Sequence, residues 1–167
     1  MAAFFSSSKG AQDMNDEPRY NYQKEINNLR SQFGLDFVSV ALVQPAEDRF
    51  VLTWQFVSGN INNRYKRIVL QSGRGIAGVV FKTGKPLLMK NVNMDIGAKD
   101  LFNYPIIVAE RLQSLGALPL WSYNRVMGVL LFGFRQENAL TEALFHLIQE
   151  EIGPEFGSLY AKERVIE

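Results

Sequence analysis

The residues best suited to chemistry form a glycine-rich turn over residues 71–78, with the sequence Gln-Ser-Gly-Arg-Gly-Ile-Ala-Gly. An apolar run typical of a strand leads into the turn, and a short stretch from Ile76 to Phe81 that favours a helix follows it. A strand, a glycine turn and a helix in this order direct free backbone N–H groups and the positive end of a helix dipole at one point. The sequence therefore predicts an anion site that needs no charged side chain.

The same glycines, Gly73, Gly75 and Gly78, also spell the G-x-G-x-x-G pattern of dinucleotide-binding proteins. That pattern should open a long helix of a βαβ unit, whereas residues 83–86, Thr-Gly-Lys-Pro, stop this helix after about two turns. No parallel strand ending in an acidic residue follows. A dinucleotide site is therefore disfavoured. Two interpretations of the glycine turn stay open. It is either an anion site or a plain tight turn whose glycines only let the helix pack closely on a sheet.

Composition limits the classes of protein to consider. The chain has 167 residues, which suggests one domain, and 47% of them are hydrophobic, which indicates a globular protein. Lys and Arg number 18 against 17 Asp and Glu, and this balance argues against a nucleic-acid-binding protein, which needs a basic excess. The sequence has no apolar run of about 18 residues and no signal-peptide core. We therefore expect a cytoplasmic protein that binds neither nucleic acid nor membrane.

The residue types needed for catalysis are scarce. The sequence contains no cysteine, which excludes disulfides, thiolate nucleophiles and cysteine-ligated metals. The single histidine, His146, lies in an apolar helical pattern, where a surface or packing role is the commoner one. No G-x-S-x-G motif occurs, and no Asp or Glu stands out in an apolar setting. The sequence thus predicts a binding protein with no catalytic residues, no metal site and no cofactor.

The pattern along the chain predicts one domain over residues 20–167, preceded by a disordered tail or expression remnant over residues 1–19. We expect helices over 21–33, 76–82 and 106–112 and from Glu142 onward, strands over 37–44, 49–57, 65–70, 87–90, 115–122 and 126–134, a four-residue turn at 45–48, and a long polar loop over 92–104. Thr141 is a suitable N-cap for the last helix. The apolar stripe of that helix comprises Leu144, Ile148, Ile152, Phe156 and Tyr160.

This order predicts an α+β fold. Two hairpins make the sheet mainly antiparallel, and each terminal helix offers one apolar stripe that must be covered. We therefore expect the terminal helices to pack together on one face of the sheet. The short helix and the long loop are left for the other face, and a ligand pocket is expected between them and the sheet.

These motifs resemble the GAF domain family over about residues 20–165. The most specific parts are the turn and helix over 73–80 (Gly-Arg-Gly-Ile-Ala-Gly-Val-Val) and the helix exit over 82–86 (Lys-Thr-Gly-Lys-Pro). The closing hairpin, with Leu-Pro-Leu at 118–120 and Arg-Val-Met-Gly-Val-Leu at 125–130, completes the pattern. The resemblance implies a sensory module whose ligand lies between the sheet and the helices of the distal face.

Residue types separate the branches of this family. The signature of cyclic-nucleotide members is absent, and bilin-binding members and methionine sulfoxide reductases of this fold need cysteines that this chain lacks. A haem member would use a histidine, and His146 lies on the wrong helix. The chain is most similar to the stand-alone nitrate receptors, in which one GAF domain binds nitrate and acts on an oxygen-sensing histidine kinase. The resemblance thus implies a two-component regulator of nitrate respiration.

The resemblance implies a nitrate site made of Trp54, Ile76, Ala77, Tyr104, Pro105 and Ile106. The indole would face the plane of the anion, backbone N–H groups at both helix starts would meet its oxygens, and the Tyr-Pro pair would shape the wall. At position 76 this chain has Ile where the family tends to Leu, so the role there is assigned to the backbone. Two alternatives stay open: a GAF domain for an amino acid or carboxylate, and a ligand-free module that dimerises through its terminal helices.

Overall fold

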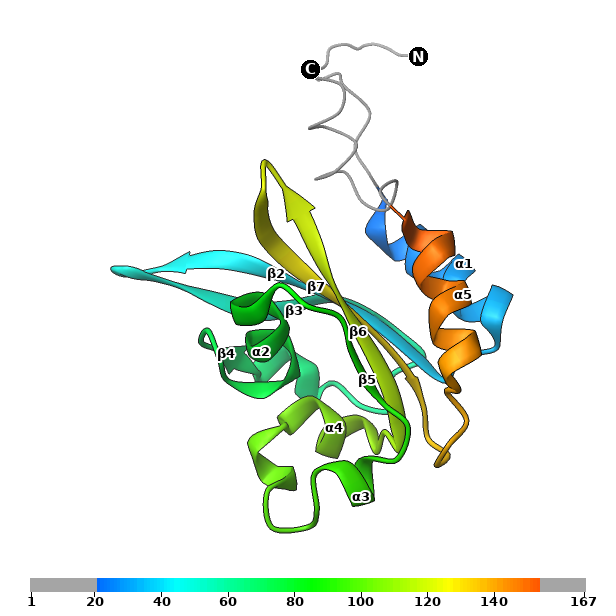
Figure 1. The fold of residues 1–167 in the computed structure, drawn as a ribbon. Helices are drawn as coiled ribbons and strands as arrows, with labels where there is room; N and C mark the ends of the chain where they lie inside the picture. Colours follow the sequence, from blue (N-terminus) through cyan, green and yellow to red (C-terminus); the bar gives the residue numbers. More distant parts are fainter. Residues whose placement is uncertain (1–20, 154–167) are drawn as a thin grey trace, which may run out of the picture.

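The computed structural model describes residues 21–153, in which a six-stranded sheet carries helices on both faces (Figure 1). The strands run in the order β4-β3-β2-β7-β6-β5, and every neighbouring pair is antiparallel. The predicted α+β fold is thereby confirmed. The predicted tail over 1–19 and the last two positions of the terminal stripe, Phe156 and Tyr160, lie outside the described residues.

The elements of the described region have the following bounds. The strands are β2 (Phe37–Ala46), β3 (Arg49–Ser58), β4 (Val69–Leu70), β5 (Leu87–Met89), β6 (Ser114–Ser122) and β7 (Arg125–Phe134). The helices are α1 (Tyr22–Phe33), α2 (Gly75–Thr83), α3 (Val92–Asp95), α4 (Pro105–Glu110) and α5 (Glu142–Ile152), with short 3-10 turns η1 (Arg64–Arg67) and η2 (Leu101–Asn103). No helix within 21–153 has both the length and the apolar character needed to cross a bilayer.

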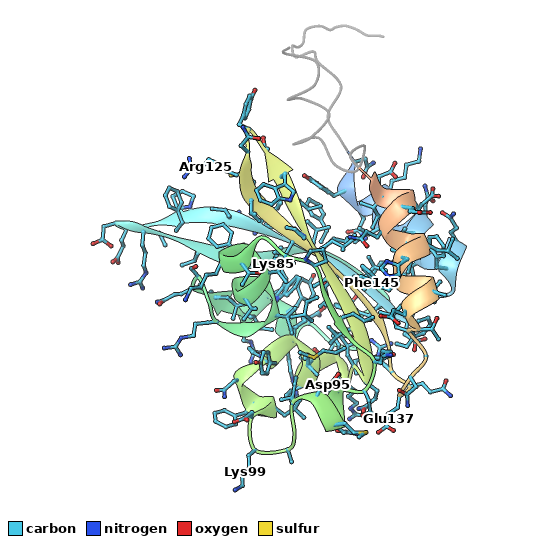
Figure 2. All side chains as sticks on the ribbon, viewed as in Figure 1. Lys85, Asp95, Lys99, Arg125, Glu137 and Phe145 are labelled. Atoms are coloured by element: carbon cyan, nitrogen blue, oxygen red, sulfur yellow. The ribbon has the colours of Figure 1, made fainter. Side chains whose placement is uncertain are left out.

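The two terminal helices, α1 and α5, lie side by side on one face of the sheet, as predicted (Figure 1). They bury Tyr22, Ile26 and Leu29 of α1 and Phe145, Ile148 and Ile152 of α5. Phe145, labelled in Figure 2, stacks on Phe132 of β7 with 5.9 Å between ring centroids. Each fully buried side chain of this kind contributes about 1.5–3 kcal/mol of transfer free energy, so this face anchors both helices.

Local signals set the ends of these helices. The side chain of Asn21 accepts a hydrogen bond from the Lys24 amide (3.0 Å), and Gly34 ends α1 in the left-handed conformation (φ 65°). The predicted N-cap of α5 is confirmed, because the Thr141 hydroxyl accepts a hydrogen bond from the Leu144 amide at 3.1 Å.

The other face of the sheet carries a second core cluster beneath α2 and α4. Side chains alternate between the two faces along β7, so that Val129 and Leu131 join this cluster while Leu130 and Phe132 point to the terminal helices. The fold therefore separates one layer, which fixes the terminal helices, from another layer, which surrounds the glycine turn.

The ladder between β2 and β3 contains one irregularity. Val40 pairs with Phe56, whereas the next residue, Ala41, pairs with Trp54, so Gln55 is the extra residue of a β-bulge. Before the bulge Trp54 faces the α2 side, and after it Phe56 stacks on a tyrosine of α1 with 5.3 Å between ring centroids. Without the bulge, residues two apart would face the same side of the sheet.

Three predicted elements differ from the structure. The strand predicted over 65–70 is wrong for residues 65–68, because Arg64–Arg67 form a 3-10 turn. Of the predicted strand, only Val69 and Leu70, which form β4, pair with β3. The amides of Lys66 and Ile68 close this turn on the carbonyls of Asn63 and Tyr65 at 3.2 Å, which leaves the charged side chains in solvent. A turn satisfies the polar backbone locally where no neighbouring strand can.

The other two differences concern loops. The polar loop predicted over 92–104 contains α3 and η2, and α3 begins where the Asn91 side chain accepts a hydrogen bond from the Met94 amide at 3.2 Å. The turn predicted at 45–48 is only two residues long, with Glu47 at φ 55°. Pro45 continues β2 because the pairing of β2 with β7 stops at Leu42, and a proline is tolerated on such an unpaired edge.

Candidate functional site

The glycine turn that opens α2 needs glycine at each of its three positions. Gly73 and Gly75 have φ values of 85° and 68°, which only glycine adopts without strain. At Gly78 a side-chain carbon would collide with the carbonyl oxygen of Gln71. The Gly73 amide also donates to the Gly78 carbonyl at 2.8 Å, so the turn folds back along the start of the helix. The glycines therefore build this turn and bring its backbone close to α2.

We expect Gly78→Ala to lower both the free energy of unfolding and the affinity for any anion bound at the start of α2. Alanine in a helix interior is normally favoured over glycine by about 1 kcal/mol, but here its methyl group must displace the turn. Urea unfolding measures the change. Lys85→Ala is the control, since Lys85 is exposed just beyond the end of α2, at the opposite end of the helix from the turn. A more stable Gly78→Ala variant would contradict the close packing.

Three backbone donors at the starts of α2 and α4 have no partner within the described residues. The residues before these helices, Arg74 and Tyr104, give no side-chain cap. Among residues 21–153, no group accepts a hydrogen bond from the amides of Ile76, Ala77 or Ile106. These three residues are at most 1% exposed. Buried amides are normally paired, so these donors are suited to a ligand with acceptor oxygens.

Trp54 adds a further donor to the same cluster. Its side chain is 3% exposed, and within the described region its indole Nε1 has no hydrogen-bond partner. Burying such an N–H without a partner costs about 1–3 kcal/mol, so the observation points to an acceptor supplied from outside the chain. Trp54 shares the α2 side with Leu52, and the bulge at Gln55 turns the next ring, Phe56, to the opposite side. The sequence prediction used only the flat face of the indole and did not anticipate the bulge or the free N–H.

The structure separates the six predicted site residues into two groups. Trp54, Ile76, Ala77 and Ile106 lie in one buried cluster. Tyr104 packs against that cluster, and together with Pro105 it is half-buried and lines an open cleft of about 650 Å³. The cleft lies between β4, the glycine turn and the segment from η2 to α4. The buried donors are thus beneath the surface, and the Tyr-Pro pair lies between them and the cleft.

A buried ion pair holds the far end of α4. Glu110 is fully buried, and its Oε1 accepts hydrogen bonds from Arg135 Nη2 at 2.6 Å and from the Ile61 amide at 2.9 Å. Arg135 also donates to the carbonyls of Glu110 (2.7 Å) and Gly59 (3.0 Å), and its amide donates to Asp36 Oδ2 (2.7 Å). α4 is therefore fixed to the end of β3, to β7 and to the junction of α1 with β2.

Sequence reasoning missed this pair. The expectation that no acidic residue stands out in an apolar setting is wrong for Glu110, which ends the run Pro-Ile-Ile-Val-Ala-Glu of α4. Within a mostly apolar six-residue helix, an acid next to buried positions was a usable signal. Its partner Arg135 lies 25 residues further along the chain, and no local pattern links the two.

Comparisons with known proteins agree with this architecture. The chain matches no protein-family model and no curated protein. It is similar to the solved structure of hypothetical protein SA1058 from S. aureus, with 42% identity, a TM-score of 0.66, and coverage of 69% of this chain and 93% of that one. A structure of NreA from Staphylococcus aureus, mutated in its nitrate binding site, gives the same identity and TM-score and is covered over 83% of its length.

A more distant similarity extends over more of the chain. The GAF domain of an Acinetobacter phosphoenolpyruvate-protein phosphotransferase is 16% identical, with a TM-score of 0.66 over 92% of this chain and 89% of that one. At this identity the match shows the fold alone. Together with the NreA match at 42% identity, it confirms the resemblance expected from the glycine turn and the closing hairpin. The chain therefore belongs to the NreA family of GAF domain proteins.

Proposed function

We propose that this protein is a cytoplasmic nitrate sensor, not an enzyme, and that it regulates a sensor histidine kinase controlling nitrate respiration. The observation that carries the proposal is a set of donors in one buried cluster that find no acceptor within residues 21–153: the indole N–H of Trp54 and the amides of Ile76, Ala77 and Ile106. The 42% identity to an NreA with a nitrate binding site supports nitrate as the ligand.

The chemistry of the cluster favours a flat monoanion. Nitrate is planar, singly charged and weakly hydrated, so an aromatic ring and a few N–H donors suit it. Each hydrogen bond to a charged group contributes about 1.5–3 kcal/mol. No Lys or Arg is buried anywhere in the described part of the chain. Sulfate or phosphate, with more charge to desolvate, would therefore enter at a greater cost.

The proposed output follows from where the ligand would sit. Ile106 lies in the first turn of α4, and the far end of this helix is joined through Arg135 to the corner between α1 and β2. A ligand that binds one arrangement of α4 better than another shifts the protein toward that arrangement. A histidine kinase, or a second copy of the chain that pairs through the terminal helices, would then meet an altered surface. The kinase itself is inferred from the family resemblance.

The expected affinity for nitrate has an upper limit. The best very small ligands gain about 1.5 kcal/mol per non-hydrogen atom, which for nitrate gives about 6 kcal/mol and a dissociation constant on the order of tens of micromolar. Isothermal titration calorimetry should therefore find binding no tighter than this. Nanomolar affinity would contradict the estimate, and no binding at millimolar nitrate would refute the proposed function.

A thermal-shift panel separates this function from its alternatives. Nitrate should raise the unfolding temperature selectively, because ligand that binds only the folded state stabilises it. Selective stabilisation by amino acids or short carboxylates would instead assign the domain to a different metabolite. No stabilisation by any of these ligands would favour the dimerisation module. Chloride and sulfate at matched ionic strength control for general salt effects.

A further inference from the structure

Charge is unevenly distributed along the chain in a way that its net charge of +1 conceals. All 17 Asp and Glu residues lie outside residues 49–94. That segment contains Arg49, Arg64, Lys66, Arg67, Arg74, Lys82, Lys85 and Lys90. The one salt bridge found among the described residues involves none of them. The segment that builds β3, β4 and α2 is therefore a solvated, purely cationic part of the surface.

Two of these cations lie at the 650 Å³ cleft. Arg74 lines it directly. A side-chain carbon built on Gly73, another lining residue, would lie 3.3 Å from Lys82 Cδ and 3.7 Å from its Nζ, so the lysine lies over the turn. η1, with three more cations, immediately precedes β4, whose two residues form part of the wall. We call this hollow the basic cleft.

The basic cleft also has apolar walls that are open to solvent. Val69 is 59% exposed and Phe102 is 75% exposed, and Leu70, Val79 and Pro105 add to the apolar lining. A volume of about 650 Å³ is far more than a four-atom anion needs, and it lies in the usual range for sites that take larger groups. Positive charge around exposed apolar side chains matches an occupant with the opposite charge and an apolar anchor.

We infer that the basic cleft docks an acidic segment of a partner protein, with an apolar side chain of that segment inserted between Val69 and Phe102. The carboxylates of the segment pair with Arg74, Lys82 and the η1 cations. A protein segment fits better than a nucleic acid, because the chain has no overall basic excess and the cleft offers aliphatic contacts beside its charges. The inference holds whether or not the buried cluster binds nitrate.

The probe is a short fluorescein-labelled peptide in which glutamates flank a central Leu-Phe pair, measured by fluorescence anisotropy with the full chain. Saturable binding is expected at low salt, and it should weaken as salt rises, since exposed charges are screened. The same peptide with glutamine in place of each glutamate should bind at least about tenfold more weakly, because opposite charges across an interface provide much of the specificity.

Matched charge reversals locate the site. The double variant Arg74→Glu/Lys82→Glu should lower affinity for the acidic peptide at least about tenfold. The control Lys24→Glu/Arg125→Glu changes net charge equally, but its residues lie on α1, on the other face of the sheet, and at the start of β7. It should bind within about twofold of the parent. Thermal unfolding of each variant confirms that it is folded, and the affinities are compared only between folded proteins.

Four results would overturn the inference: no saturable binding, equal binding of the glutamine peptide, an equal loss in the control variant, or tighter binding of an oligonucleotide or phosphatidylserine vesicles than of the peptide. All measurements are repeated with nitrate present. If the chain binds the peptide but not nitrate, the docking surface is supported and the proposed sensor function is refuted. If it binds nitrate but not the peptide, the sensor function is supported and the docking surface is refuted.

Discussion

Replacing Trp54 with phenylalanine is expected to weaken nitrate binding at least about tenfold, or about 1.4 kcal/mol, while the melting temperature stays near that of the parent. Phenylalanine keeps the aromatic face and much of the volume, but it removes the indole N–H that has no partner within residues 21–153. An anion in this cluster would lose a charge-assisted hydrogen bond in a site from which water is excluded. Calorimetry on both proteins measures the loss.

Two further variants make this test decisive. Trp54→Ala should also lose nitrate binding, but a large buried aromatic removed from a core costs about 3–5 kcal/mol of stability, so its lost binding could report unfolding. Trp121→Phe is the matched control, because Trp121 is 41% exposed on β6. It also leaves Trp54 as the only tryptophan, so that fluorescence reports on the cluster directly. Normal nitrate affinity in Trp54→Phe would mean that the ring is plain core.

The ion pair at the end of α4 should produce the largest loss of stability. Arg135→Ala leaves the fully buried Glu110 carboxylate without its charged partner, and breaking a buried pair in this way costs about 3–5 kcal/mol. The free energy of unfolding in urea should fall accordingly. Because Glu110 Oε1 also holds the Ile61 amide, Glu110→Ala should be comparably destabilised.

The controls for this prediction are an exposed cation and a double variant. Arg64→Ala removes a solvent-exposed charge without an ion pair and should change stability by less than about 0.5 kcal/mol. Glu110→Leu/Arg135→Met replaces the pair by apolar groups and should recover much of the loss, since it leaves no charge unpaired. A single variant as stable as the parent would show that the pair is unimportant for folding.

Local rules anticipated most of the fold. α1 was predicted over 21–33 and occupies Tyr22–Phe33, and the N-cap at Thr141 is where it was expected, because periodicity and capping depend on residues a few positions apart. The same reasoning failed for η1, where a Tyr-, Ile- and Val-containing run resembles a strand. Residues 65–68 have no neighbouring strand to pair with, and pairing is not visible in a local window.

The candidate site was only partly accessible to such reasoning. The start of α2 could be predicted because three closely spaced glycines indicate a tight turn with positive φ angles. The choice of Trp54, Tyr104 and Ile106 depended on family resemblance. The free indole N–H, the bulge at Gln55 and the pairing of Glu110 with Arg135 depend on contacts between distant segments, so the amino-acid order alone does not reveal them.

The bulge in β3 has a consequence for how proteins of this kind can diverge. Gln55 is an extra residue in β3, so residues two apart across it face opposite sides of the sheet. Leu52 and Trp54 therefore belong to the layer around the glycine turn, and Phe56 belongs to the layer of the terminal helices. Substitutions at Leu52 or Trp54 act on the layer around the glycine turn, whereas substitutions at Phe56 act on the layer of the terminal helices. A single strand thus supplies side chains to both layers of the core, so each layer can be altered through this strand one residue at a time.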